Sequence, residues 1–313
     1  MGEAADNQGA RKLPAHFYAG IALIAAMEIF IILNMAAITT WATPVLWTGL
    51  ILACDGLLAW RTGRSVIRTG AIFPLAVISV AGWWMFEWFN IFLSNWHYVN
   101  LVPSLKLRYA GYVWSFATIV PGVLLTYGAL NLLPGGLRRA PIRISRRALV
   151  AMFIAGLIFL FIPIVPFSMY YAGRAADEAL FVFLRWAANT WYAEFTAAFV
   201  WLGFVLLLEP LNYLMGNRSL LGALEKGDYR PLALLSAAGL IDGLLWEFWN
   251  YWAFTKWRYT VPILGDVKIF EMPVLGYFGF VAFAWELYNM VSLLYPRALD
   301  LIEGERESHT QGA

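Results

Sequence analysis

Residues 17–39 read FYAGIALIAAMEIFIILNMAAIT, an apolar run that contains a single charged side chain, Glu28. An α-helix needs about 20 apolar residues to cross the hydrocarbon core of a bilayer. The apolar region of a cleaved signal peptide is shorter, at about 7–15 residues. The run therefore predicts a first membrane-spanning helix.

Further apolar runs follow along the chain, and short polar clusters separate them. Of all residues, 61% are apolar and 13% are charged, whereas soluble domains carry about 25% charged residues. This composition excludes a soluble globular protein and predicts an all-α, polytopic membrane helix bundle of eight transmembrane helices. We expect the spans at 17–39, 43–60, 70–94, 110–133, 148–168, 192–214, 231–254 and 274–295.

Lysine and arginine are distributed unevenly between the two sides of these spans. Cytoplasmic loops carry an excess of both residues, and most of the 22 in this chain fall on one side. We therefore expect a multi-pass protein of the cell's inner (plasma) membrane with both termini in the cytoplasm. The segment 178–190 is apolar but short, and we interpret it as an interfacial helix, although a crossing there would give nine spans. The predicted parts are a cytoplasmic segment 1–16, a first membrane repeat 17–133, a basic linker 134–147, a second membrane repeat 148–295 and a cytoplasmic tail 296–313.

The two halves of the chain resemble each other. The sequence FEWFN at 86–90 corresponds to WEFWN at 246–250, and each is followed by a Trp-x-Tyr segment. Each half holds four predicted spans, an even number, so we expect two tandem four-helix repeats of the same orientation, in contrast to the inverted repeats of many transporters. The other matches are Trp47 with Trp201, Gly49 with Gly203, Asp55 with Glu209, Arg64 with Arg218, Ser65 with Ser219 and Gly111-Tyr112 with Gly276-Tyr277.

Acidic side chains lie within the predicted spans without lysine or arginine beside them. An ionisable group at that depth is costly, which makes it a functional candidate. Several of these acids are followed three residues later by asparagine, as in Glu87 and Asn90, and residues at this spacing share one helix face. The alternative is that these groups only form hydrogen bonds between helices, which we expect for Asp55 and Glu209 near the interface. The candidate catalytic residues are Glu87, Glu247, Asn90, Asn250, Glu286 and Asp242.

Aromatic side chains surround these acids at helical spacing. Their π-faces could stabilise a cation within a pocket, whereas others belong to the aromatic belt at the membrane surface. We expect the belt for Trp96 and Trp257. The candidate substrate-binding residues are Trp84, Trp88, Trp246, Trp249 and Tyr277.

Several classes of protein lack support in the sequence. Three histidines and one cysteine cannot supply a zinc or di-iron site, so we expect no metal and no cofactor. The net charge of +2 does not favour a nucleic-acid partner. No dinucleotide-binding, P-loop or nucleophile-elbow pattern occurs. The functions that remain are acid–base catalysis, transport and ligand binding.

One segment carries a resemblance to a known family. It runs from Trp257-Arg258-Tyr259 through the sequence KIFEMPVLGYFGF at 268–280, and it resembles the membrane lycopene cyclase domain of archaea, fungi and actinobacteria. That family is similar in its Trp-x-Tyr segment, in the proline that opens a Phe-rich helix and in its two related helical domains. The resemblance implies a shared fold and a cavity shaped for a polyisoprenoid. The family has paired glutamates after the proline, where this chain has Leu275 and Gly276, so no catalytic residue is carried over.

These patterns predict a protein that binds or converts a long apolar, isoprenoid- or carotenoid-like molecule by redox-neutral acid–base chemistry such as cyclisation, hydration or isomerisation. Glu87 and Glu247 would donate and accept the proton, and Asn90 and Asn250 would orient them. One alternative is a proton-coupled transporter with a relay of carboxylates. Another is a non-catalytic subunit of a membrane complex. The expected small-molecule partner is a membrane lipid or isoprenoid. The expected protein partner is a second copy of the chain, in a homo-oligomer, or another subunit of a membrane complex.

Overall fold

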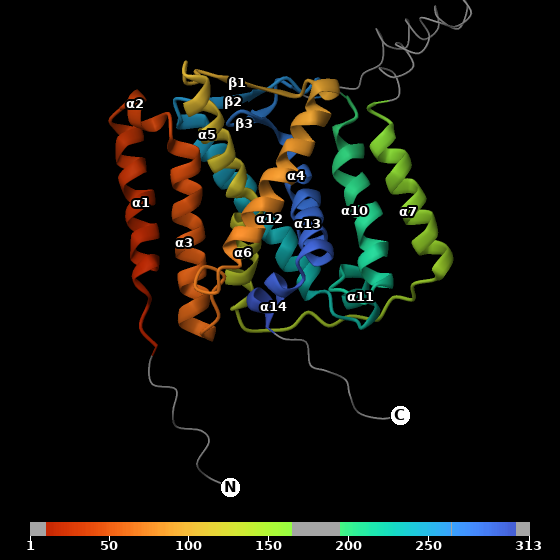
Figure 1. The fold of residues 1–313 in the computed structure, drawn as a ribbon. Helices are drawn as coiled ribbons and strands as arrows, with labels where there is room; N and C mark the ends of the chain where they lie inside the picture. Colours follow the sequence, from red (N-terminus) through yellow and green to blue (C-terminus); the bar gives the residue numbers. More distant parts are fainter. Residues whose placement is uncertain (1–10, 165–194, 264, 305–313) are drawn as a thin grey trace, which may run out of the picture.

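The computed structural model describes residues 11–164, 195–263 and 265–304. These residues form a bundle of helices that run between two ends of the molecule (Figure 1). The helices are α1 (Ala15–Ile32), α2 (Ala36–Thr39), α3 (Ala42–Thr62), α4 (Ile72–Leu93), α5 (Leu105–Ala117), α6 (Ile119–Asn131), α7 (Arg146–Phe161), α10 (Ala197–Leu214), α11 (Leu220–Glu225), α12 (Arg230–Trp252), α13 (Tyr277–Leu294) and α14 (Arg297–Glu303). The short elements are β1 (Trp96–Val99), β2 (Lys256–Tyr259), β3 (Lys268–Ile269), β4 (Met272–Pro273) and the 3₁₀ turn η3 (Val274–Gly276).

Within the described residues, 7 helical segments are long and apolar enough to cross a membrane. They are α1, α3, α4, the continuous pair α5–α6, α10, α12 and η3 with α13. Large apolar side chains on their outer faces are exposed, for example Phe73 at 74%, as expected for surfaces that face lipid. The chain is therefore a multi-pass helical membrane protein.

The expected fifth span, 148–168, is described only in part. Helix α7 covers 16 residues up to Phe161, which is short of a span, and the described chain stops shortly after it. The segment 178–190 lies outside the described residues. Eight spans therefore remain a prediction.

Local sequence signals explain where several helices begin and end. Helix α3 ends at Gly63, which adopts the left-handed conformation (φ 78°) that glycine accommodates at helix C-termini. Helix α7 begins after Ser145, whose hydroxyl accepts a hydrogen bond from the Ala148 N–H (3.1 Å), a common N-terminal cap. The first predicted span, 17–39, is interrupted because the chain turns at Asn34 (φ 54°) between α1 and α2.

The helices form a central group flanked by two outer pairs. Figure 1 places α1 with α3 at one side, α7 with α10 at the other, and α4, α6, α12 and α13 between them. Glycine permits close approach in both outer pairs, as in many membrane helices. A Cβ atom on Gly20 of α1 would lie 2.5 Å from the Gly49 carbonyl oxygen of α3. One on Gly156 of α7 would lie 2.9 Å from the Gly203 carbonyl oxygen of α10.

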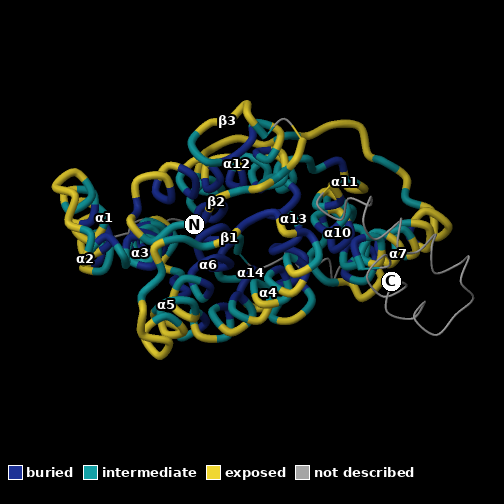
Figure 2. The backbone as a smooth tube through the Cα atoms, turned by 90° about the horizontal axis from the view of Figure 1, so that it is seen from above, coloured by how far each residue is buried: buried dark blue, intermediate teal, exposed yellow. Residues whose placement is uncertain are grey.

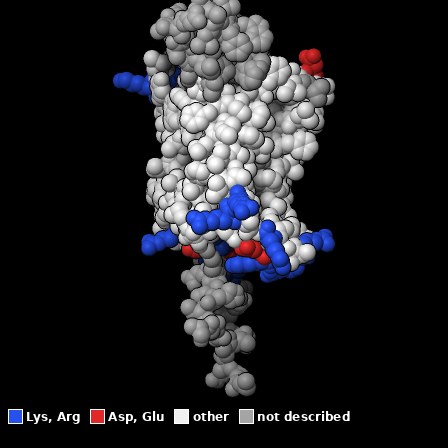
Figure 3. All heavy atoms as spheres, turned by 90° about the vertical axis from the view of Figure 1, so that its right-hand side faces the viewer, with Lys and Arg blue, Asp and Glu red and all other residues white. Residues whose placement is uncertain are grey.

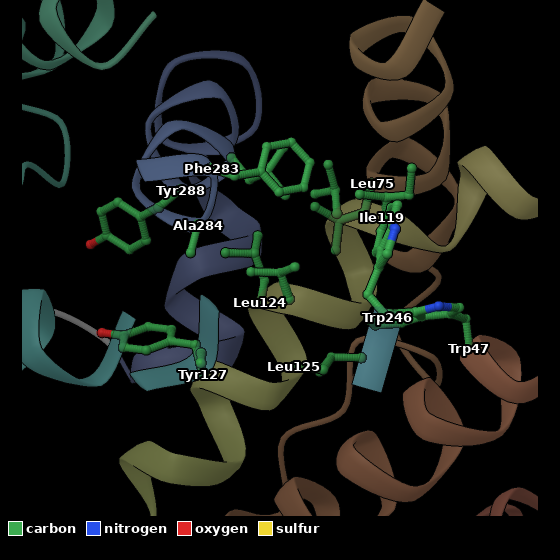
Figure 4. Packing of buried hydrophobic residues seen from close by; sticks show 14 of the residues in the cluster. Trp47, Leu75, Ile119, Leu124, Leu125, Tyr127, Trp246, Phe283, Ala284 and Tyr288 are labelled. Atoms are coloured by element: carbon green, nitrogen blue, oxygen red, sulfur yellow. The ribbon is translucent and has the colours of Figure 1, made fainter. Parts of the chain in front are cut away.

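The core lies in the central group. Viewed from above in Figure 2, the buried backbone concentrates around α6 and α13, and the exposed backbone lies on the outer side of α1, α2 and α5. Figure 4 shows Leu124 and Leu125 of α6 between Phe283 of α13 and the indole of Trp246. Trp47 of α3 packs edge-on against Trp246, with ring centroids 5.4 Å apart.

A short antiparallel sheet joins the two halves of the chain. Strand β1 pairs with β2 so that Trp96 lies opposite Tyr259, and Tyr98 lies opposite Trp257. Each tryptophan of one Trp-x-Tyr segment therefore faces the tyrosine of the other. We call this end of the bundle the strand end.

The opposite end of the bundle is rich in positive charge, and we call it the basic end. Lysine and arginine gather there in Figure 3. The helix ends and connections at this end contain Arg61, Arg64, Arg68, Arg138, Arg139, Arg143, Arg146, Arg147, Arg218, Lys226, Arg230 and Arg297.

The glycine contacts lead to a stability prediction. Gly156→Val should lower the free energy of unfolding by about 1–3 kcal/mol, the usual cost of overpacking, because the new Cβ would lie 2.6 Å from the Leu207 amide nitrogen. Thermal unfolding in detergent measures the change. Gly136→Val is the matched control, because a Cβ there meets nothing within 4 Å. Equal melting temperatures for the two variants would contradict the proposed close packing of α7 on α10.

Candidate functional site

The candidate site lies where α4 and α12 meet the strand end. Each helix carries a glutamate and, three residues later, an asparagine, shortly before it leads into its strand. The two glutamates are Glu87 and Glu247. Glu247 is completely buried, and Glu87 is half-buried.

The asparagines hold the strands in place. The Asn250 amide donates to the Trp257 carbonyl oxygen (2.9 Å) and accepts from the Trp257 N–H (2.9 Å). Asn90 bonds Trp96 in the same way, at 2.8 Å and 3.3 Å. These amides thus bond strand backbone instead of the neighbouring glutamates that we expected them to orient. The Glu-x-x-Asn spacing places both side chains on the same face of the helix. The asparagine lies about one turn closer than the glutamate to the end of the helix, so its amide bonds the strand that follows.

Glu87 accepts hydrogen bonds from three aromatic side chains. Its Oε1 receives the indole N–H of Trp83 (2.9 Å), the indole N–H of Trp96 (3.1 Å) and the hydroxyl of Tyr98 (2.5 Å). Trp96 and Trp257 were expected in the interfacial belt, yet both are buried. Their indole N–H groups donate to neighbouring side chains, that of Trp96 to Glu87 and that of Trp257 to the Tyr259 hydroxyl.

Glu247 has fewer partners. Its Oε1 accepts from the Tyr259 hydroxyl (2.8 Å), which itself accepts from the Trp257 indole N–H (2.9 Å). Its Oε2 is buried without a hydrogen-bond partner. The two glutamates therefore occupy related positions with different surroundings: Glu87 is well supplied with donors, and Glu247 keeps one oxygen free.

Burial keeps the two tyrosines in their neutral form. Burial, followed by the charge of the adjacent glutamate, raises the pKa of Tyr98 and of Tyr259 well above the ordinary phenol value. Both hydroxyls therefore retain their protons at physiological pH and donate to the glutamates. Tyr98 and Tyr259 were not among the predicted residues of this site, although the repeated Trp-x-Tyr segments were the signal that could have revealed them.

A cavity of about 450 Å³ lies between α10, α13 and the strands, and we call it the α10–α13 cavity. Its inner wall consists of aromatic residues from both halves, among them Trp83, Tyr98, Trp246, Trp257 and Tyr259. None of the described residues that line it carries a charged side chain. Such an apolar cavity with a few polar groups is typical of small-molecule sites.

A second, smaller cavity of about 80 Å³ lies on the other side of this wall, against α3 and α5. Trp83, Tyr98, Trp246 and Trp257 line both cavities. The smaller cavity differs in its charge, because Arg108 and Lys256 contribute to its lining.

The five predicted aromatic residues are dispersed. Trp246 lines both cavities, and Trp249 is buried and donates to the Glu28 carboxylate (2.8 Å). Trp84 and Trp88 are 41% and 45% exposed. They lie on the outer face of α4, rotated by about 100° and 140° around the helix axis from the inward Trp83. The Tyr277 hydroxyl donates to the Ile269 carbonyl oxygen (3.1 Å), and Tyr277 does not line the α10–α13 cavity.

The remaining acids lie deeper in the bundle. Asp242 accepts from the Thr126 hydroxyl of α6 (2.9 Å), and its Oδ2 is buried without a partner. Glu286 is completely buried, and neither of its oxygens has a partner. Among the described residues, no group of three or more His, Cys, Asp or Glu could hold a metal ion.

The two acids nearest the basic end have structural contacts, as expected. Asp55 accepts from the Ser65 hydroxyl (2.6 Å) and the Val66 N–H (2.7 Å). Glu209 accepts from the Ser219 hydroxyl (2.7 Å) and the Leu221 N–H (2.7 Å). Each acid thus fixes the chain that follows its own helix.

The asparagine contacts lead to a second prediction. Asn250→Ala should destabilise the protein by about 1–3 kcal/mol for each backbone group of Trp257 left unpaired. The loss for Asn90→Ala should be smaller, because Asn90 is half-buried and Asn250 is fully buried. Thermal unfolding followed by near-ultraviolet circular dichroism measures both. His97→Ala is the control, since that exposed side chain does not hold the strand backbone. Loss of stability no greater for Asn250→Ala than for His97→Ala would contradict this role.

Comparisons with known proteins add no identity to this geometry. The chain matches no protein-family model, no curated protein and no solved structure.

Proposed function

We propose that the protein binds a long apolar, isoprenoid-like molecule in the α10–α13 cavity and converts it by redox-neutral acid–base chemistry. The observation that carries this proposal is the aromatic wall of the cavity, where Tyr98 and Tyr259 are each backed by a glutamate. A polyene is also the substrate class implied by the resemblance to membrane lycopene cyclases.

The size and lining of the cavity support such a ligand. Binding sites for small molecules usually have volumes of about 300–1,000 Å³ and largely apolar walls, and this cavity has about 450 Å³. Protonation of a polyene creates a carbocation. The π-faces of Trp83 and Trp246 would stabilise that charge without a basic side chain that could quench it.

We assign the acid to Glu247 and Tyr259. Glu247 has a buried oxygen without a partner, an environment that favours an uncharged carboxyl group. With Glu247 protonated, its Oε1 hydroxyl would donate to the Tyr259 oxygen, and the Tyr259 hydroxyl would turn towards the cavity. Tyr259 would then transfer its proton to a ligand carbon while Glu247 supplies the replacement proton and becomes a carboxylate. After ring closure or a double-bond shift, a proton lost from the ligand would return through Tyr259 to Glu247, so that the cycle needs no oxidant or reductant. Glu87, which already accepts from three donors, would keep the opposite side of the wall in place.

The same proposal includes eight spans in two tandem repeats of one orientation. It is supported by contacts that recur in both halves: glycine packing in the two outer pairs, an acid that fixes the following serine and an asparagine that holds a strand. We also propose that the protein lies in the plasma membrane with its basic end towards the cytoplasm. Both termini would then be cytoplasmic.

A proton-coupled transporter is the second candidate, and one observation favours it. The buried oxygens of Glu286, together with Asp242 Oδ2, have no partners, as expected of groups that take up and release protons within a membrane. Proton-gradient-dependent flux in proteoliposomes that is lost in Glu286→Gln, with Glu247→Gln still active, would support transport instead of the proposed chemistry.

The proposed chemistry leads to a third prediction. Lipids and pigments that co-purify with the protein should include an isoprenoid, identified by mass spectrometry. Glu247→Gln and Tyr259→Phe should each slow conversion of that molecule in membranes by about 10²-fold or more, the usual contribution of a general acid, and should leave its binding intact.

Glu28→Gln is the control, since Glu28 bonds Trp249 and neither residue lines the α10–α13 cavity. Folding of each variant is checked by gel filtration. Unchanged conversion in both Glu247→Gln and Tyr259→Phe would remove these residues from the mechanism.

A further inference from the structure

Helices α10 and α13 are joined near the basic end and leave room between them near the strand end. At the basic end, the Asn212 amide donates to the Asn289 carbonyl oxygen (2.9 Å) and side-chain oxygen (3.0 Å). Near the strand end, small residues line the space between the helices, Ala198 on α10 and Gly279 and Ala282 on α13. A Cβ atom on Gly279 would meet nothing within 4 Å. The cavity exists because these side chains are too small to fill it.

The outer edge of the cavity is formed by residues that also face outward. Leu202 of α10, Leu275 of η3 and Phe278 of α13 line the cavity and are 40%, 47% and 69% exposed. All three belong to segments that are long and apolar enough to cross a membrane. The surface that they share with the cavity would therefore be in contact with lipid.

Polar contacts among the described residues lie at both ends of the bundle. At the basic end, Arg218 binds Asp300 (2.8 Å) and Glu303 of α14. At the strand end, the Asn100 amide donates to the Phe254 carbonyl oxygen (2.9 Å), and the Thr255 hydroxyl donates to the Asn100 carbonyl oxygen (2.7 Å). Entry between α10 and α13 would leave all of these contacts in place.

The lining also limits the charge of a ligand. A charged headgroup in the α10–α13 cavity would lose water and gain no opposite charge from the described residues, because those that line it are uncharged. Burial of an unpaired charge is very costly. The neighbouring small cavity shows the contrast, since Arg108 and Lys256 line it. Prenyl phosphates and fatty-acid carboxylates are therefore unsuitable occupants.

We infer that the occupant of the α10–α13 cavity is an uncharged lipid that enters sideways from the membrane, between Leu202 of α10 and Phe278 of α13. This inference rests on the proposed function and adds the route and the charge of the substrate. An uncharged polyene, prenyl alcohol or quinone tail dissolved in the bilayer fits it, and a substrate delivered from water does not.

A photolabelling experiment tests the inference in the full-length protein in lipid vesicles. The probes are a long-chain prenyl alcohol and its monophosphate, each with a diazirine on the chain, and mass spectrometry locates the labelled residues. The alcohol should label residues at the opening, Leu202 and Phe278, and residues deep in the cavity, Trp83 and Phe283. The monophosphate should label the deep residues at least about tenfold less, a difference of about 1.4 kcal/mol in binding.

Two variants block the opening from opposite sides. Gly279→Trp and Leu202→Trp should each reduce deep labelling by the alcohol at least about tenfold and preserve labelling at the lipid surface. Leu202 is already partly exposed, so its replacement should not disturb folding, which gel filtration checks for both variants. Val77→Trp is the matched control, because Val77 is 69% exposed on α4 and lines neither cavity.

The outcomes separate the route from the function. Deep labelling that persists in both folded variants would overturn sideways entry and leave ligand binding in the cavity intact. Equal deep labelling by the monophosphate would overturn the preference for an uncharged lipid. Absence of deep labelling in the wild-type protein, with labelling at the surface, would overturn the inference together with the proposed function.

Discussion

The pairing of β1 with β2 is the contact on which the rest of the site depends. These strands lie far apart in the sequence, and their antiparallel register places each tryptophan opposite a tyrosine of the other half. Asn90 and Asn250 fix each strand to the end of its own helix through backbone bonds. The sheet thus joins the two halves, and it places the phenols of Tyr98 and Tyr259 within hydrogen-bond distance of Glu87 and Glu247.

The two halves then differ in what surrounds the same elements. In the first half, Trp83 and Trp96 add donors to Glu87, and a large ring, Trp41, lies against Gly111 with only a small cavity nearby. In the second half, Glu247 keeps an oxygen free, and alanine and glycine leave the larger cavity open. The surroundings of Glu87 therefore suit a supporting role, and the larger cavity beside Glu247 is the place where we propose that the ligand binds.

The helices and their approximate bounds could be predicted because the length of an apolar run is set by the thickness of the membrane. Which face of each helix points into the bundle could not be predicted. A helix that is apolar all round has no periodic pattern that distinguishes its lipid-facing side from its protein-facing side. For that reason Trp84 and Trp88 were expected in the pocket, whereas Trp83 lines it. Strands β1 and β2 were not predicted either. Each has only four residues, which is too short to show a clear alternation of apolar and polar side chains. The matched Glu-x-x-Asn motifs were recognisable in the sequence, but the hydrogen-bond partners of their asparagines lie on strands that the chain brings back only when folded.

The wall between the two cavities has a mechanical consequence. Trp83 and Trp246 stand with ring centroids 5.5 Å apart, and both rings border the larger and the smaller space. Densely packed rings cannot yield to a guest on one side without shifting towards the other. A guest that displaced these rings from one side would therefore change the shape of the compartment on the other, and Arg108 and Lys256 contribute to the lining of the smaller one.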